Sequence, residues 1–136
     1  MNQQQKQLKI ILIGDTCIDE YQYGTVDRIS PAAPVPVFVP KYTDFKSGMG
    51  SNVKENLVAL GLHVVSFLGD PSKKKRLIDA KSKQQLMRID DDVQSHPCQL
   101  EYVLDYISDS DALVISDYAK GFVTEDFIKD IRQRYT

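Results

Sequence analysis

Three short apolar runs along the chain predict buried strands of a parallel sheet. They are LKIILI, VVSFL and ALVI, at residues 8–13, 64–68 and 112–115. Each run is short, and each ends at a polar break, as strands covered on both faces do. Helical spacings of apolar residues lie between or after the runs, at 53–60, 100–107 and 124–134. Because strands alternate with helices, we predict an α/β sheet built from right-handed crossovers.

Signals at helix ends support two of these helices. The first is expected to end at Gly61, a C-cap residue, and to bury a face formed by Val53, Leu57 and Leu60. The last helix follows Thr124, a good N-cap, and carries acidic residues in its first turn and arginines in its last. Both patterns therefore define elements that cover the sheet.

Other segments predict a second, smaller sheet. Residues 34–40 read PVPVFVP, and because proline cannot donate to a central ladder they form an edge strand or leave the main sheet. Residues 76–90 read as a hairpin around Lys81-Ser82-Lys83. Together with YQYGTV at 21–26 they suggest three or four strands. A flap of this size can act as a lid or a dimer contact.

Composition limits the classes of partner. The 136 residues are 42% hydrophobic and 26% charged, as in one soluble globular domain. A net charge of -2 argues against nucleic acid, so an anion needs a local cluster, and Lys73–Arg76 is the nearest one. Those four residues alternate between two faces on a strand. Cys17 and Cys98 show no disulfide or metal spacing, and neither a leader nor a membrane span is evident, so we expect a cytoplasmic protein.

An acidic residue follows each predicted core strand: Asp15, Asp70 and Asp117. Ligands of open α/β sheets bind beyond the carboxyl ends of the strands. Carboxylates there accept hydrogen bonds from sugar hydroxyls or hold a metal, whereas they repel phosphate. The alternative is that each Asp only forms a turn or a cap. Three at equivalent positions favour a polyol or metal site.

The segment SGMGSNV, at 47–53, enters the same region. It lacks the GK[ST] ending of a P-loop and the third glycine of GxGxxG. Its glycines allow the backbone to approach a ligand closely, and Asn52 offers both a donor and an acceptor. We therefore predict a sugar-facing turn. Neither histidine, His63 or His96, has an evident partner in the sequence, so no catalytic role is expected for them.

Several motifs resemble a known family. They are VDRISPAAPVPVF (26–38), SGMGSNVKENLVALG (47–61), SKQQLMRID (82–90) and SDYAKGFVTEDFI (116–128). Their order is similar to the amino-terminal half of the ribokinase-like carbohydrate kinases, closest to the heptose-7-phosphate kinases that make ADP-heptose for lipopolysaccharide or capsule. The resemblance implies a parallel α/β sandwich with a small β lid at about 20–43 and 74–90.

The resemblance also implies roles for individual residues. Asp15, with Asp19 close behind, is expected to contact sugar hydroxyls. The turn residues Gly48, Met49 and Asn52 line the same pocket. The SDYAKG segment lies near the sugar phosphate and the transferred phosphate, so it supplies Asp117 as a polar contact and Lys120 as a cation. The lid is expected to cover the sugar and to pair two subunits.

The chain departs from the family in three places. Met49 stands where the family has a second adjacent glycine, and the usual helix and strand after Gly69-Asp70 have no counterpart. No glycine follows Gly121, so the glycine-rich turn with the catalytic Asp, and the half that binds ATP and Mg²⁺, are missing from the pattern. We therefore expect residues 1–136 to form one truncated domain without catalytic or metal-binding residues of its own.

Two functions remain open at this point. The first is a sugar kinase homologue that is incomplete as a catalyst, since phosphoryl transfer needs a positioned nucleotide and a base. The second is a non-catalytic module for sugar binding or dimerisation. A homodimer through the lid or an apolar sheet edge is expected in either case, because unpaired edges invite pairing. Nucleic acid and membrane are not expected partners.

Overall fold

The computed structural model describes residues 7–135, which divide into two compact units. Unit 1 holds the described parts of Met1–Cys17, Ser47–Pro71 and Val93–Thr136. Unit 2 holds Ile18–Lys46 and Ser72–Asp92. Two long strands, Thr16–Ile29 and Pro36–Met49, have residues in both units.

Unit 1 is built on a three-stranded parallel sheet, as predicted. Its strands are β1 (Lys9–Gly14), β4 (His63–Leu68) and β7 (Ala112–Ser116), in the order β4-β1-β7. Central Ile11 lies opposite Val65 on one side and Leu113 on the other. Because all three strands run in the same direction, their carboxyl ends meet at one edge, where the three strand-end aspartates follow.

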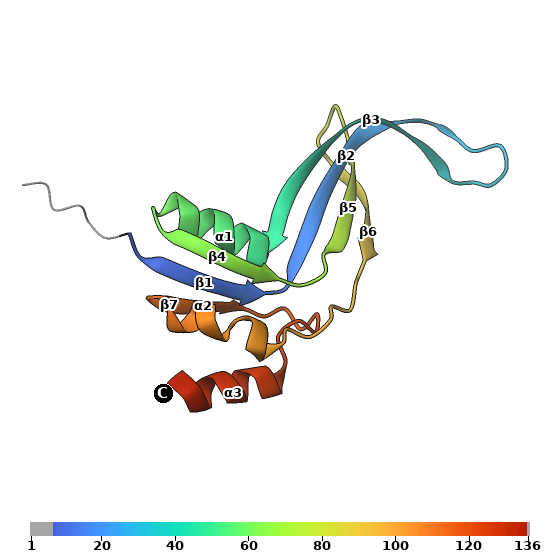
Figure 1. Ribbon diagram of the computed structural model, residues 1–136. Coiled ribbons are helices and arrows are strands. Elements are labelled where there is room, and N and C mark those ends of the chain that lie inside the picture. Colours follow the sequence, from blue (N-terminus) through green and yellow to red (C-terminus); the bar gives the residue numbers. More distant parts are fainter. Residues whose placement is uncertain (1–6, 136) are drawn as a thin grey trace, which may run out of the picture. The chain divides into compact units, whose positions relative to one another are not determined.

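Helices cover both faces of this sheet (Figure 1). The elements are α1 (Gly50–Ala59), the 3₁₀ turn η1 (Leu100–Tyr102), α2 (Leu104–Ser108) and α3 (Glu125–Tyr135). Ile11 and Ile13 are fully buried and pack with residues of η1, α2 and α3. Full burial of such a side chain is worth about 1.5–3 kcal/mol. The core cluster of buried residues consists of Ile11, Ile13, Leu100, Val103, Ile107, Val123, Phe127 and Ile131.

The predicted helix ends agree with the structure better than the predictions for the helix interiors do. Thr124 caps α3 through a hydrogen bond from the Phe127 N–H to Thr124 Oγ1 (3.1 Å), and Gly61 ends α1 with a φ of 83°. The single helix predicted at 100–107 is wrong, because Val103, 1% exposed, separates η1 from α2. The buried position predicted for Leu60 is also wrong, since it is 76% exposed.

Unit 2 is the predicted small sheet, with four strands. They are β2 (Thr16–Ile29), β3 (Pro36–Met49), β5 (Ser72–Asp79) and β6 (Gln85–Asp91), in the order β3-β2-β5-β6. The proline-rich strand is at the edge, as its missing N–H donors require. The hairpin between β5 and β6 turns around Lys81–Lys83, where Asp79 accepts hydrogen bonds from both the backbone and the hydroxyl of Ser82.

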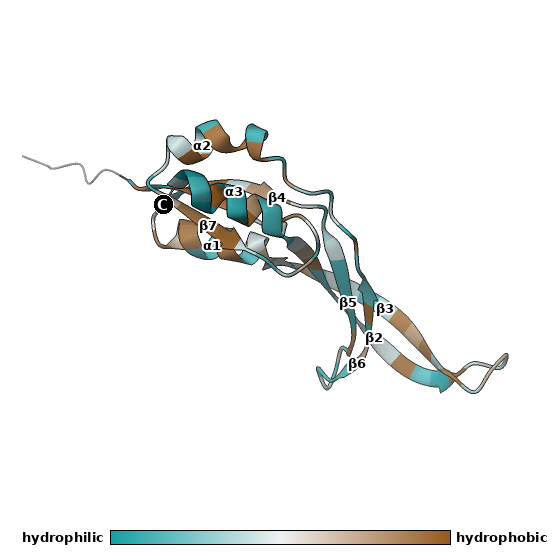
Figure 2. Cartoon of the chain, turned by 90° about the horizontal axis from the view of Figure 1, so that it is seen from below, coloured by the Kyte–Doolittle hydropathy of each residue, from teal (hydrophilic) through white to brown (hydrophobic). Residues whose placement is uncertain are grey.

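Unit 2 exposes many apolar side chains, and hydrophilic residues lie along β5 and β6 (Figure 2). Exposed large side chains of this unit are Val26, Ile29, Val35, Val39, Tyr42, Phe45, Leu86, Met87 and Ile89.

A separate finding concerns membranes. Within residues 7–135, the helices are all too short or too polar to cross one.

Candidate functional site

Asp15 organises the loop that follows β7. Its side chain is 1% exposed, directly after β1. Oδ2 accepts hydrogen bonds from the backbone N–H groups of Tyr118 (2.7 Å) and Lys120 (3.2 Å). Oδ1 accepts a third from Phe122 (3.3 Å). A carboxylate that accepts several backbone N–H groups is a strong and specific anchor, so Asp15 holds the loop in one conformation.

The main chain of Asp15 ties two further segments to the same point. Its N–H donates to Ser116 O (3.0 Å), and its carbonyl accepts from Gly50 N–H (2.8 Å) at the start of α1. A Cβ at Gly50 would lie 2.7 Å from Asp15 O and 2.8 Å from Leu68 Cδ2, so only glycine fits there. The SGMG segment and the 117–122 loop are therefore joined through one residue.

The loop from Asp117 to Phe122 needs unusual backbone geometry. Ala119 has a φ of 57° and Gly121 a φ of 97°. Asp117 Oδ1 accepts from Ala119 N–H (2.8 Å), which closes a local turn. This loop follows the carboxyl end of β7 and carries Lys120, for which the family resemblance predicts a contact with phosphate.

The SGMG segment is a strand end that passes directly into a helix, rather than a separate turn. β3 ends at Met49 and α1 begins at Gly50. Met49 is 8% exposed and has a φ of 53°, a conformation that favours glycine. Gly48 is buried and Asn52 is exposed in the first turn of α1. The departure noted at Met49 therefore introduces backbone strain at this junction.

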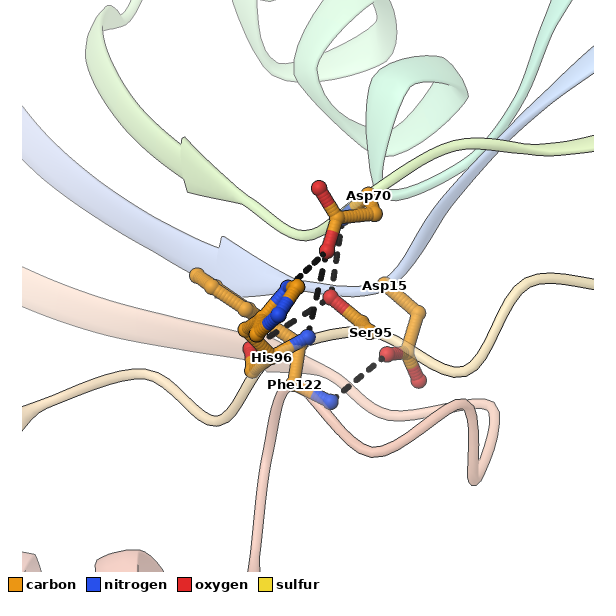
Figure 3. A network of polar contacts seen from close by, with 5 residues as sticks. All are labelled: Asp15, Asp70, Ser95, His96 and Phe122. Atoms are coloured by element: carbon orange, nitrogen blue, oxygen red, sulfur yellow. Dashed lines mark hydrogen bonds and ion pairs between the residues drawn. The ribbon is translucent and has the colours of Figure 1, made fainter.

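A polar network missed by the sequence lies beside this loop (Figure 3). His96 Nδ1 is 2.9 Å from Asp70 Oδ2, and the His96 backbone N–H donates to the same oxygen (3.1 Å). These bonds lower the pKa of the Asp70 carboxyl. Ser95, 4% exposed, accepts from the Asp70 N–H (2.8 Å) through its Oγ and donates its own N–H to Lys120 O (2.7 Å). No sequence signal pairs Asp70 with a histidine 26 positions away.

The Asp70–His96 pair borders a cavity of about 290 Å³. The cavity walls are mainly apolar, including Phe67, Phe122 and the half-buried Cys98. Burial raises the pKa of the Cys98 thiol, and the side chain packs against the core. The imidazole is 95% exposed at the rim of the cavity, against 48% for the Asp70 side chain.

Asp19 lies in unit 2, where it pairs with Arg76 at 2.5 Å. The carboxylate raises the pKa of the Arg76 guanidinium. The structure thus brings Asp15, Gly48, Met49, Asn52, Asp117 and Lys120 into unit 1 and places Asp19 in unit 2. Whether these residues contact sugar remains a prediction for each of them.

The described residues do not fit a metal site. Within residues 7–135, no three His, Cys, Asp or Glu side chains gather in a way that could hold an ion. Of the strand-end aspartates, Asp15 binds backbone amides and Asp70 binds His96. We therefore assign no step to a metal ion on the described residues.

Comparisons with known proteins give relatives at the level of sequence. No protein-family model matches the chain. It is 34% identical over 160 residues to the bifunctional protein HldE of Syntrophotalea carbinolica, covering 93% of this chain and 33% of that protein. Identity to the HldE of Aliarcobacter butzleri is 33%, with 93% and 34% covered. The resemblance that the motifs predict is thereby confirmed.

The chain spans about a third of the length of these relatives. The alignment to the first is longer than the chain itself, so that relative carries residues without counterparts here. Among solved structures, a carbohydrate kinase from Agrobacterium tumefaciens superposes with a TM-score of 0.45 at 14% identity, covering 80% of this chain and 45% of that one. The ribokinase of Giardia lamblia gives 0.43 at 12%, with 94% and 47% covered.

Proposed function

We propose, from the premise that this chain is a ribokinase-like homologue of the bifunctional HldE proteins, that it binds a phosphorylated sugar. The proposed substrate is a heptose phosphate, as the motifs imply, and the proposed phosphoryl donor is ATP with Mg²⁺. The chain contributes the sugar side of such a kinase. On this proposal, the nucleotide site and the catalytic base of such a kinase are not among these 136 residues.

One observation carries the proposal: the loop that presents Lys120 is folded around the buried carboxylate of Asp15. A cation fixed at the carboxyl end of a parallel strand is suited to an anionic group of a ligand. Asp117 in the same loop and Asn52 in α1 are exposed polar groups suited to hydroxyls. We assign Lys120 to the phosphate and these two to the sugar.

The second candidate is a non-catalytic module that binds sugar or forms a homodimer. The exposed apolar side chains of unit 2 favour dimerisation. The position of β7 at an edge of the parallel sheet offers another surface. A cytoplasmic location suits both candidates.

An assay of phosphoryl transfer tests the proposal and separates the two candidates. The purified chain is incubated with ATP, Mg²⁺ and heptose 7-phosphate, and ADP formation is followed. We expect no turnover above background by this chain alone, together with saturable binding of the sugar phosphate. Turnover by the chain alone would overturn the claim that it is an incomplete catalyst. Absence of sugar phosphate binding, combined with a stable dimer in light scattering, would favour a dimerisation module.

A further inference from the structure

The basic run Lys73–Arg76, which the function proposed above does not use, divides between two faces of the unit 2 sheet. Lys75 forms an ion pair with Glu20 (3.2 Å), whereas Arg76 pairs with Asp19 (2.5 Å). Neighbouring residues of a strand point to opposite faces. The face of Arg76 is therefore shared with Asp19, and by the period of two also with Lys74 and Tyr21.

Cations from two strands converge on Tyr21 of that face. Lys46 Nζ lies 5.1 Å from the centre of the Tyr21 ring, and Arg76 Cζ lies 5.0 Å from it. Lys46 comes from β3 and Arg76 from β5, on either side of β2. Contacts of this length are cation–π interactions, which use no hydrogen-bond donor, and Arg76 keeps donors besides the Nη1 that binds Asp19.

A second arginine stands directly beside the first. Arg76 and Arg88 are cross-strand partners in the antiparallel pairing of β5 with β6. Like charges in that arrangement are destabilising. Arg88 is paired with Asp90 (2.8 Å), and half of its side chain remains exposed. Asp19 and Asp90 offset part of this repulsion, and an anion between the two guanidinium groups would offset more of it.

The charge balance around Tyr21 is positive. Five cations, Lys46, Lys74, Arg76, Lys83 and Arg88, face three carboxylates, Asp19, Asp44 and Asp90. Unit 2 as a whole has ten lysines and arginines and eight aspartates and glutamates, although the full chain has a net charge of -2. The local excess of two positive charges matches a phosphate monoester near neutral pH.

Beyond Tyr21, the same face continues into an aromatic pair. Tyr23 stacks on Tyr42 with ring centres 4.7 Å apart, and Lys83 Nζ lies 4.9 Å from the Tyr23 ring. Tyr42 is partly exposed. Aromatic rings with polar rims offer an apolar surface next to the cations. The face therefore combines a phosphate-sized positive centre with a flat surface for the rest of a small ligand.

We propose that this face of unit 2, formed by Tyr21, Lys46, Arg76 and Arg88, binds the phosphate group of a small phosphorylated ligand. The two guanidinium groups grip the phosphate oxygens through their planar forks, and the Lys46 ammonium adds a third contact. Arg76 is only 19% exposed, so its attraction is screened less than that of a surface cation. The identity of the ligand as a sugar phosphate rests on the function proposed above.

The test is a residue-resolved NMR titration of the whole chain with three probes: heptose 7-phosphate, heptose without phosphate, and inorganic phosphate. We expect both phosphate-bearing probes to shift the backbone amides of Tyr21, Arg76 and Arg88 in a saturable way. Arg88→Ala is expected to weaken the binding of both about tenfold. Arg76→Lys keeps the charge but loses the fork, and is expected to weaken it as well. Lys73→Ala, one position outside the face, is the matched control and is expected to change nothing.

The outcomes separate this inference from the proposed function. If heptose 7-phosphate shifts the amides near Lys120 while Tyr21, Arg76 and Arg88 stay unperturbed, the sugar function stands and the phosphate face is refuted. If inorganic phosphate saturates the face and heptose 7-phosphate binds nowhere else, the face is supported and the sugar function fails. Equal binding by wild type and Arg88→Ala would also refute the inference.

Discussion

Replacing Asp15 by Asn tests whether its carboxylate organises the loop that carries Lys120. The substitution keeps the shape of the side chain but removes the charge and turns one acceptor oxygen into an NH₂ donor. In the native structure both oxygens accept from backbone N–H groups, of Tyr118, Lys120 and Phe122, at 2.7–3.3 Å. One of those amides must therefore face another donor in the variant.

The expected cost follows from these contacts. A hydrogen bond to a charged group contributes about 1.5–3 kcal/mol and a neutral one about 0.5–1.5 kcal/mol, so the Tyr118 bond loses part of its strength. A buried donor left without an acceptor costs about 1–3 kcal/mol more. Since Asp15 is 1% exposed, water does not replace the lost acceptor. We expect Asp15→Asn to lower the free energy of unfolding by about 2–4 kcal/mol.

Urea unfolding followed by circular dichroism measures this cost, and amide hydrogen exchange locates it. Protection is expected to fall at the amides of Tyr118, Lys120 and Phe122. Asp117→Asn is the matched control, because Asp117 is exposed and accepts only the Ala119 N–H in this loop; its cost is expected to be below about 1 kcal/mol. A change under about 0.5 kcal/mol for Asp15→Asn, with unchanged protection of the loop amides, would refute the role of the carboxylate.

Three further predictions concern the same region. Ala119→Gly is expected to raise the free energy of unfolding by about 1 kcal/mol in urea titrations, because it relieves a φ of 57° at an exposed residue; a loss of stability would contradict the strain. The pKa of Asp70 is lowered by His96, so its pairing stabilises the fold above the ordinary Asp pKa and is lost as pH falls through the lowered value. Asp70→Asn should therefore flatten the acid limb of the stability curve, and an unchanged limb would exclude this pair as its source. Because burial raises the pKa of Cys98, Ellman's reagent at pH 8 should label it more slowly in folded than in urea-unfolded chain, and equal rates would exclude that protection.

The core of the fold was predictable because its signals are local. Four apolar residues in a row, Ile10 to Ile13, make β1 a buried strand, and the caps at Thr124 and Gly61 act through neighbouring backbone groups. The prolines at 34–40 predicted an edge position for β3, because proline has no backbone N–H to donate to a neighbouring strand. By contrast, the helix predicted at 100–107 is interrupted at Val103, although Leu100, Val103 and Ile107, which share the helical spacing, all pack into the core.

The site was predictable in position but not in its contacts. Parallel strands bring their carboxyl ends to one edge, so the aspartates after β1, β4 and β7 could be expected to lie near one another. Their partners could not be read from the sequence. Asp15 binds amides more than a hundred positions away, and Asp70 binds His96 across 26 positions. Spacing along the chain carries no signal for contacts that depend on how two loops meet.

The length of β3 shows a different limit. Its last residues, Ser47, Gly48 and Met49, read as a glycine turn, yet they continue the strand up to the first residue of α1. Glycine gives the chain freedom without fixing how it is used. Here Gly50 is a position where the approach of Asp15 O leaves no room for a side chain.

The most direct test of sugar phosphate binding is isothermal titration of the chain with heptose 7-phosphate and, in parallel, with heptose that carries no phosphate. We predict saturable binding of the phosphorylated sugar, with a dissociation constant between about 1 μM and 1 mM, the range typical of enzyme substrates. Free heptose is predicted to bind at least about tenfold more weakly, since it lacks the charged group that Lys120 would meet. Equal affinity for the two sugars, or no saturable heat with the phosphorylated one, would contradict the proposed function.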